Sequence, residues 1–192
     1  LVGHSYSGMV ISGVAQRVPE RIAHLVYVDS NLPEDGETMM SLWSDEKKER
    51  ILRNAREEGQ GWKVIPWWTD PPQDGAHPLA SWTQPVKLDN PDAAQIPGTY
   101  VRALQKEKEE SEESDAIVLE RVKARGYAYH EWKSEHNPQR SALREYVTVF
   151  LDDGDRARFF GVTLPHLCAL ALRLPELCPD GLPLLRRGHA SA

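Results

Sequence analysis

The stretch that decides the fold opens the chain and reads Leu1-Val2-Gly3-His4-Ser5-Tyr6-Ser7-Gly8-Met9-Val10. It predicts the end of a buried strand, a tight turn with Ser5 at its apex, and the start of a helix. In a strained strand-to-helix turn of this kind, called a nucleophile elbow, the serine Oγ is exposed at the end of a sheet. The sequence therefore makes Ser5 a candidate nucleophile.

Small residues are expected on both sides of the serine, because the turn brings the strand and helix backbones close together. Gly3 meets this need two positions before Ser5. Two positions after it stands Ser7 where glycine is usual, with Gly8 directly behind. The alternative to an elbow is any glycine-rich turn between a strand and a helix, and the rest of the chain argues against it.

Composition describes an ordinary globular chain of 192 residues, 40% hydrophobic and 27% charged, with a formal net charge of −6. The acidic balance argues against a nucleic-acid partner, since binding phosphates needs a basic face. No apolar run approaches the roughly 20 residues that span a bilayer, and no secretory signal precedes the elbow. We therefore expect a cytoplasmic protein with no membrane partner. Two cysteines, Cys168 and Cys178, are too few for a disulfide framework or a zinc site.

Helices and strands alternate along the chain and predict an α/β fold built on a mostly parallel sheet. The clearest strand is the apolar, β-branched run 22–29, which is typical of a parallel strand buried on both faces. The other expected elements are a helix at 9–18, a polar helix within 38–59, a strand at 99–104, a helix at 117–124 ended by Gly126, a strand at 127–132 and a helix at 141–151.

Residues 62–97 interrupt this alternation with many tryptophans and prolines. Prolines exclude regular central strands here, while the tryptophans need apolar cover. An insertion of this kind between two core strands is typical of a cap over an active site. Charged residues from 105 to 115 predict a solvated loop or helix start.

Several motifs together resemble those of bacterial α/β-hydrolases related to plant methylesterases and hydroxynitrile lyases. They are the elbow 3–8, the strand and turn 21–36, the cap stretch 77–85 and the segment 96–102. The resemblance implies a partial α/β-hydrolase domain over 1–151, with a cap insertion at about 33–96. The tail 152–192 is outside it and stays unassigned.

The chain begins inside the strand that leads to the nucleophile. Members of the resembled family have several strands and a His-Gly oxyanion loop before the elbow. We therefore expect the chain to be the C-terminal part of a longer hydrolase, or to receive the rest of the sheet from a partner chain. An exposed sheet edge at Leu1 and Val2 would also allow self-association.

The family order of catalytic residues is serine, acid, histidine, and the resemblance assigns Ser5 as the nucleophile and His136 as the base. His136 follows the last expected strand, where its ring can reach the serine. Histidines 4, 24, 77, 130, 166 and 189 compete poorly because they fall beside the nucleophile, in strands, in the cap or in the tail. Two residues compete for the acid. Glu107 follows the strand 99–104, where the family acid is usual, and Asp29 ends the strand beside the nucleophile strand.

The expected substrate site is built around the elbow. The Tyr6 backbone N–H would donate half of the oxyanion hole. His4 and three cap tryptophans, Trp43, Trp67 and Trp82, are expected to bind the substrate, although any of the tryptophans could instead be core.

The resemblance implies a carboxylesterase-type serine hydrolase that cleaves a small ester through an acyl-enzyme, without metal or organic cofactor. One alternative is a hydroxynitrile-lyase-like acid/base catalyst, which typically adds a lysine near the base; no residue is clearly in that role. The other is a catalytically inactive remnant that acts as a binding or structural module.

Overall fold

The computed structural model describes residues 1–66, 75–105 and 112–138. The chain divides into two units, Leu1–Tyr146 and Val147–Ala192, and every described residue belongs to the first. Trp67, Glu107, the helix expected at 141–151 and the tail from residue 152 lie outside the described residues. Within the described ranges, no helix is long and apolar enough to cross a membrane.

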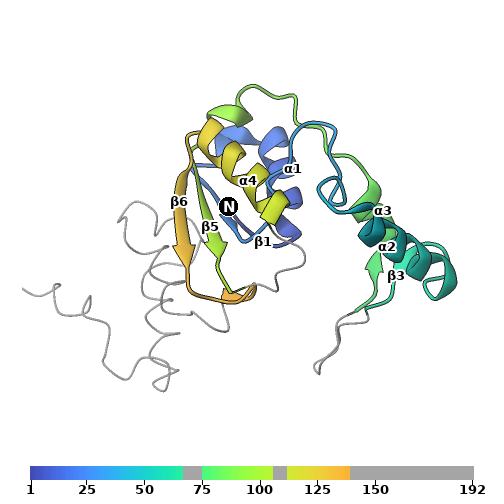
Figure 1. Cartoon of the computed structure of the whole chain (residues 1–192). Helices are drawn as coiled ribbons and strands as arrows, with labels where there is room; N and C mark the ends of the chain where they lie inside the picture. Colours follow the sequence, from blue (N-terminus) through green and yellow to red (C-terminus); the bar gives the residue numbers. More distant parts are fainter. Residues whose placement is uncertain (67–74, 106–111, 139–192) are drawn as a thin grey trace, which may run out of the picture. The chain divides into compact units, whose positions relative to one another are not determined.

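Four parallel strands form the main sheet (Figure 1): β1 (Val2–His4), β2 (Leu25–Val28), β5 (Gly98–Ala103) and β6 (Ala128–Trp132), in the order β1-β2-β5-β6. The predicted parallel sheet is confirmed, because each neighbouring pair runs in parallel. Every residue of β2 is buried, which explains its unbroken apolar sequence. Since the strands run the same way, the residues that follow their carboxyl ends can meet at one edge of the sheet.

Two helices pack on the sheet, α1 (Ser7–Arg17) and α4 (Glu112–Ala124). They contribute to one core cluster, which also holds Tyr27 of β2 and Tyr100 of β5, through the side chains of Ile11, Ala15, Val118 and Val122. Because the cluster joins both helices to the same strand side chains, α1 and α4 cover the same face of the sheet. The two predicted helices are therefore confirmed, although α4 begins at Glu112, earlier than expected.

The connection from α1 to β2 differs from the expected one. A short 3-10 turn, η1 (Pro19–Arg21), follows α1, and the Ile22 N–H donates to the Pro19 carbonyl at 3.0 Å. Proline is tolerated at the start of such a turn because the N–H that it lacks would have no acceptor within the turn. The strand consequently begins at Leu25 instead of residue 22, and His24, expected within the strand, precedes it.

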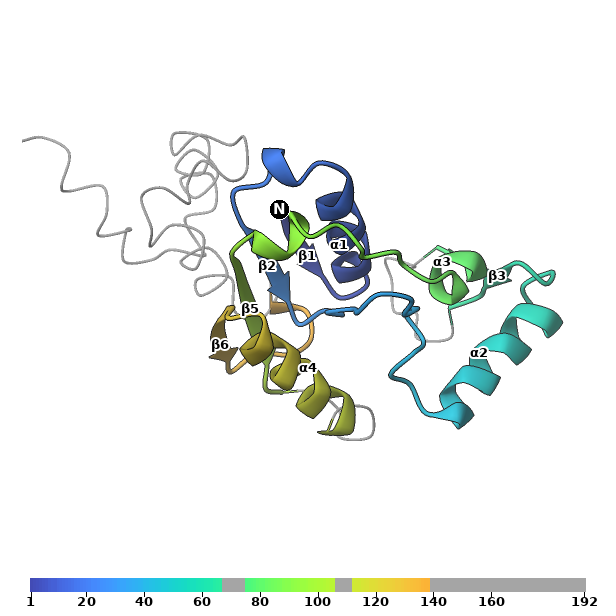
Figure 2. The ribbon, with the colours of Figure 1, turned by 90° about the horizontal axis from the view of Figure 1, so that it is seen from above.

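The insertion after β2 has a small core of its own. It contains α2 (Asp45–Glu57), the antiparallel pair β3 (Lys63–Val64) and β4 (His77–Pro78), α3 (Leu79–Thr83) and the 3-10 turn η2 (Ala93–Gln95). α2, α3 and β3 lie together in both ribbon views (Figures 1 and 2). Their shared cluster of buried side chains consists of Met40, Ile51, Ala55, Val64 and Trp82. The predicted lack of long strands in this proline-rich stretch is confirmed within its described residues.

The polar helix of this insertion is shorter than the range 38–59 in which it was expected. Residues 38–43 form turns instead, with the Ser41 N–H on the Thr38 carbonyl at 3.1 Å. α2 begins after Ser44, whose side chain accepts from the Lys47 N–H at 3.2 Å. A serine in this position satisfies a donor that the first helical turn leaves unpaired, so the helix starts there.

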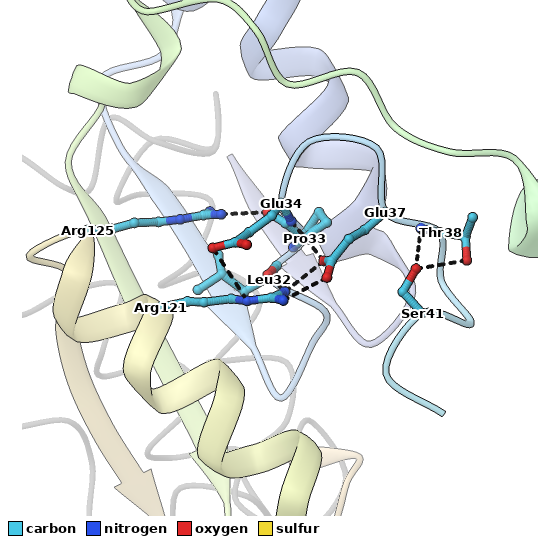
Figure 3. A network of polar contacts seen from close by, with 8 residues as sticks. All are labelled: Leu32, Pro33, Glu34, Glu37, Thr38, Ser41, Arg121 and Arg125. Carbon is cyan, nitrogen blue, oxygen red and sulfur yellow. Dashed lines mark hydrogen bonds and ion pairs between the residues drawn. The ribbon is translucent and has the colours of Figure 1, made fainter. Parts of the chain in front are cut away.

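Arg121 of α4 and Arg125, which follows the helix, hold the loop that leads from β2 into the insertion (Figure 3). Arg121 donates to both carboxylate oxygens of Glu37 at 2.7 Å and to the Leu32 carbonyl at 2.9 Å. Arg125 donates to the Pro33 carbonyl. The Arg121 side chain is only 10% exposed, so this paired geometry is shielded from water. The first residues of the insertion are thereby fixed to the C-terminal end of α4.

The pair between Glu37 and Arg121 should make the fold less stable in acid. Burial alone would raise the pKa of the Glu37 carboxyl, but hydrogen bonds from Arg121 and the Glu34 N–H outweigh burial and lower that pKa. The unfolded chain then takes up the proton more readily than the folded one. The pair's contribution is therefore complete above the usual glutamate pKa of about 4.3 and is lost as the pH falls through the lowered folded-state pKa.

Urea unfolding between pH 7 and pH 3 measures this effect in the wild type and in Glu37→Gln. The difference in free energy of unfolding between the two proteins should be largest at neutral pH and should shrink in acid. A difference that stays constant over this range would show that the Glu37 charge does not stabilise the fold.

Candidate active site

Ser5 lies between β1 and α1 with a φ of 55°, in the left-handed region that non-glycine residues rarely adopt. Its N–H donates to the Val28 carbonyl at 3.2 Å, and its own carbonyl accepts from Gly8 and Asn31. These bonds hold the strained turn, and a strained residue of this kind is typical of a functional site. The predicted strand-turn-helix geometry is present, with Ser5 at its apex.

Two close backbone approaches mark the elbow, one at Gly3 on the strand side and one at Gly8 on the helix side. A Cβ on Gly3 would lie 2.8 Å from the Ser7 carbonyl oxygen, as expected for a crowded turn. On the helix side, Ser7 is only half-buried, whereas a Cβ on Gly8 would lie 2.0 Å from the Asn31 carbonyl oxygen. Glycine is therefore needed three positions after Ser5, because the loop after β2 crosses α1 there. The expected need for a small residue two positions after Ser5 stays a prediction.

Asp29 follows β2 and is buried, with a side chain 1% exposed. Its backbone is also in the left-handed region, with φ at 41°, and its N–H donates to the Val101 carbonyl at 2.7 Å. One carboxylate oxygen, Oδ1, accepts from the Ala103 N–H at 3.1 Å. The bond from Ala103 fixes the carboxylate, and its other oxygen faces the loop after β6.

His136 lies in that loop and joins Asp29 to Ser5. Its Nδ1 is 2.6 Å from Asp29 Oδ2, and its Nε2 is 3.0 Å from Ser5 Oγ. A carboxylate can only accept, so Nδ1 carries a proton and donates it to Asp29. In the neutral ring Nε2 then has a free lone pair, which accepts the Ser5 hydroxyl proton. The three side chains therefore form one hydrogen-bonded chain that ends on the serine.

Of the two candidate acids, the structure brings Asp29 to His136. Glu107 lies outside the described residues. Among the remaining histidines, His24 Nε2 lies 2.9 Å from Thr99 Oγ1, and His130 is exposed on β6. His166 and His189 lie outside the described residues.

His4, the residue before Ser5, contacts the His136 loop. Its Nε2 is 2.7 Å from the His136 carbonyl oxygen, and the two imidazole rings are 4.8 Å apart between centroids. Burial lowers the pKa of His4, and this effect outweighs the hydrogen bond to the His136 carbonyl, which raises that pKa. His4 was expected to bind substrate, and in the structure its Nε2 contacts the backbone carbonyl of His136.

Aromatic rings connect the elbow to the insertion. The Tyr6 ring meets His77 edge-on at 5.0 Å, and His77 stacks on Trp82 at 4.9 Å. Trp82 in turn meets Trp43 edge-on at 5.5 Å. The tryptophans Trp43 and Trp82 thus pack together within the insertion, while Trp67 lies outside the described residues.

Two residues near Tyr6, His77 and Ser81, were not predicted from the sequence to belong to the site. Ser81 Oγ lies 2.6 Å from His77 Nε2, and the Ser81 carbonyl accepts from the Tyr6 hydroxyl at 3.3 Å. Their spacing of four residues, one helical turn, was the available signal. The aromatic residue beside the nucleophile is thus tied to the insertion by both its ring and its hydroxyl.

Comparisons with known proteins agree with this architecture. One similar solved structure is an extracellular α/β-hydrolase from a Paenibacillus species, described as sharing homology with tobacco salicylic acid binding protein 2. It has a TM-score of 0.64 and 20% identity over 77% of this chain and 69% of that one. A second is a pyrethroid hydrolase from Sphingobium faniae JZ-2, with a TM-score of 0.54 and 21% identity over 79% of this chain and 70% of that one.

Two further matches are short. A carbendazim-hydrolysing esterase from Nocardioides sp. strain SG-4G is 57% identical over 42 residues, which is 22% of this chain and 17% of the esterase. Residues 151–192 match the helical domain of poly(ADP-ribose) glycohydrolase, and all of them lie outside the described residues.

The parallel sheet of this chain thus superposes on that of solved bacterial enzymes, with TM-scores of 0.64 and 0.54. The expected fold class is confirmed. The chain has the α/β-hydrolase fold.

Proposed function

We propose that this protein is a serine hydrolase that cleaves a small carboxylic ester through an acyl-enzyme on Ser5. The observation that carries the proposal is the chain of hydrogen bonds from Ser5 through His136 to Asp29, at 3.0 and 2.6 Å. A hydroxyl is a weak nucleophile until a base is in place to take its proton. The 57% identity of a short stretch to an esterase supports the same class of reaction.

The first half of the reaction forms the acyl-enzyme. Ser5 Oγ attacks the ester carbonyl carbon while its proton moves to His136 Nε2. Asp29 stays ionised and stabilises the imidazolium that results. When the tetrahedral intermediate collapses, the C–O bond to the alcohol breaks and His136 returns the proton to the departing oxygen. The acyl group remains on Ser5.

The second half repeats these steps with water. His136 removes a proton from water as the water oxygen attacks the acyl carbon, and the proton then passes to Ser5 Oγ as the ester bond to the serine breaks. The products are a carboxylic acid and a restored serine. No oxidant or reductant enters the balance.

The developing oxyanion needs donors that are already in position. Tyr6 immediately precedes α1, where backbone N–H groups have no intrahelical acceptor and the helix dipole is positive. We assign the Tyr6 N–H as one donor of the oxyanion hole. The Tyr6 side chain faces the insertion, where its ring contacts His77 and its hydroxyl donates to the Ser81 carbonyl.

A fluorophosphonate probe tests the proposal, because it reacts with serines that a neighbouring base activates. We expect stoichiometric labelling of Ser5, located by fragmentation of the labelled peptide, and loss of labelling in Ser5→Ala. The control variant is Ser7→Ala, which removes another hydroxyl of the same turn and should label like the wild type. An unlabelled wild type would favour the inactive binding module, and labelling that survives in Ser5→Ala would exclude Ser5 as the nucleophile.

A further inference from the structure

The backbone of His136 is held by a side chain from the opposite end of the described sheet. His4 ends β1, and His136 follows β6, the strand at the other end of the order β1-β2-β5-β6. The two meet through the 2.7 Å contact between His4 Nε2 and the His136 carbonyl oxygen. A carbonyl oxygen can only accept, so His4 Nε2 carries a proton and donates it.

This contact lies where the loop needs support. Nearer β6, the loop is tied by the Gln105 N–H, which donates to the Ser134 carbonyl at 2.9 Å. The His136 side chain, two residues further on, is 46% exposed, so packing alone holds it weakly. An error of about 1 Å in such a group can cost about 100-fold in rate. The hydrogen bond from His4 restrains the backbone of His136, the residue whose position matters most for proton transfer.

His4 is also the neighbour of Ser5, the residue whose hydroxyl contacts His136. Because His4 precedes Ser5 in the chain, one short segment supplies both the serine and the donor that fixes the base. Burial of the His4 ring lowers the pKa of His4 despite the hydrogen bond to His136, so the neutral form is favoured. A neutral neighbour adds no charge repulsion when His136 becomes an imidazolium, 4.8 Å away between ring centroids.

We propose that His4 is a positioning residue, whose Nε2–H holds the His136 backbone so that the imidazole spans Ser5 and Asp29. The proposal rests on the proposed function for its kinetic consequence. Its geometric consequence, a fixed hydrogen bond between His136 Nδ1 and Asp29, does not depend on the substrate.

Two amide variants of the same polarity test the proposal, because they differ only in reach. The Nε2 of glutamine occupies about the place of a histidine Nε2, so His4→Gln keeps the donor. His4→Asn carries its amide one carbon shorter and cannot reach the carbonyl. In p-nitrophenyl acetate hydrolysis, we expect His4→Asn to lower kcat by about 10- to 100-fold with KM within about twofold, and His4→Gln to stay within about threefold of the wild type.

A second readout uses no ester. The proton on His136 Nδ1, hydrogen-bonded to Asp29, should give a resolved downfield signal in proton NMR of the wild type and His4→Gln, and the signal should broaden or vanish in His4→Asn. If the NMR pattern holds while no variant hydrolyses the ester, the positioning inference stands and the proposed function fails. The inference would be overturned if His4→Asn kept the kcat and the NMR signal of His4→Gln. It would also be overturned if both variants lost activity and signal to the same extent.

Discussion

Replacing Asp29 by asparagine is expected to lower kcat for ester hydrolysis by about 10⁴-fold while the protein stays folded. The asparagine oxygen can still accept from the Ala103 N–H, so the buried site keeps that bond. Its amide N–H₂ then faces His136 Nδ1 and donates to it, which moves the ring proton to Nε2. A protonated Nε2 points at Ser5 and can no longer accept the hydroxyl proton.

The companion variant is Glu107→Gln, which changes the other acid considered from the sequence. We expect it to keep kcat within about threefold of the wild type, because Asp29 already occupies the bonding position on His136. Steady-state kinetics on p-nitrophenyl acetate, with circular dichroism to check folding, measure both variants. If Glu107→Gln loses activity while Asp29→Asn keeps it, the assignment of the acid is reversed.

Replacing Gly8 by alanine is expected to cost about 3 kcal/mol or more in the free energy of unfolding. The added Cβ would lie 2.0 Å from the Asn31 carbonyl oxygen and 2.8 Å from Ser30 Oγ. The nearest atom belongs to the backbone, so a rotamer change cannot relieve the clash, and α1 must shift against the loop after β2. That shift would also disturb Ser5, whose carbonyl accepts from the Gly8 and Asn31 N–H groups.

Gly13→Ala is the matched control in the same helix. Its Cβ would meet nothing within 4 Å. Alanine there should stabilise the helix by up to about 1 kcal/mol, because glycine is the weaker helix former. Thermal unfolding should therefore give a Tm lowered by roughly 6 to 12 °C for Gly8→Ala and unchanged or raised for Gly13→Ala. A Gly8→Ala protein as stable as the wild type would contradict the close approach at the elbow.

Elements with a strong local signal were predictable from the sequence. The run from Leu25 to Val28 is apolar throughout because β2 is buried, and the elbow has a nearly fixed pattern of small residues. Both features depend on a few neighbouring residues, which is why the sequence alone is informative. His136 was assigned through the family resemblance, because its contacts with Ser5 and Asp29 join residues far apart in the chain.

The choice of acid depends on tertiary geometry, and the sequence left it open. Asp29 and Glu107 each follow a predicted strand, so both were compatible with the fold. Asp29 reaches His136 because its turn places the carboxylate against the Ala103 N–H at the end of β5, the strand between β2 and β6. Strand order and a left-handed backbone at Asp29 produce this arrangement, and neither has a signature in a single sequence.

The insertion was predictable in kind and poorly predictable in detail. Prolines and tryptophans indicated an irregular cap, but partners of individual rings depend on how its short elements fold back on one another. Trp82 packs between His77 and Trp43, and Lys47 lies over the Trp43 ring at 4.4 Å from its centroid. Trp43 and Trp82, expected to bind substrate, therefore have packing partners within the insertion.

The most direct test of the central claim, that Ser5 forms an acyl-enzyme with His136 as its base, is rapid-quench mass spectrometry after mixing with p-nitrophenyl acetate. We expect an acetyl group on Ser5, in the tryptic peptide that ends at Arg17, which appears during the first turnover and is absent in Ser5→Ala and His136→Ala. Release of p-nitrophenol with no acetyl group on Ser5, or at an equal rate in Ser5→Ala, would contradict it.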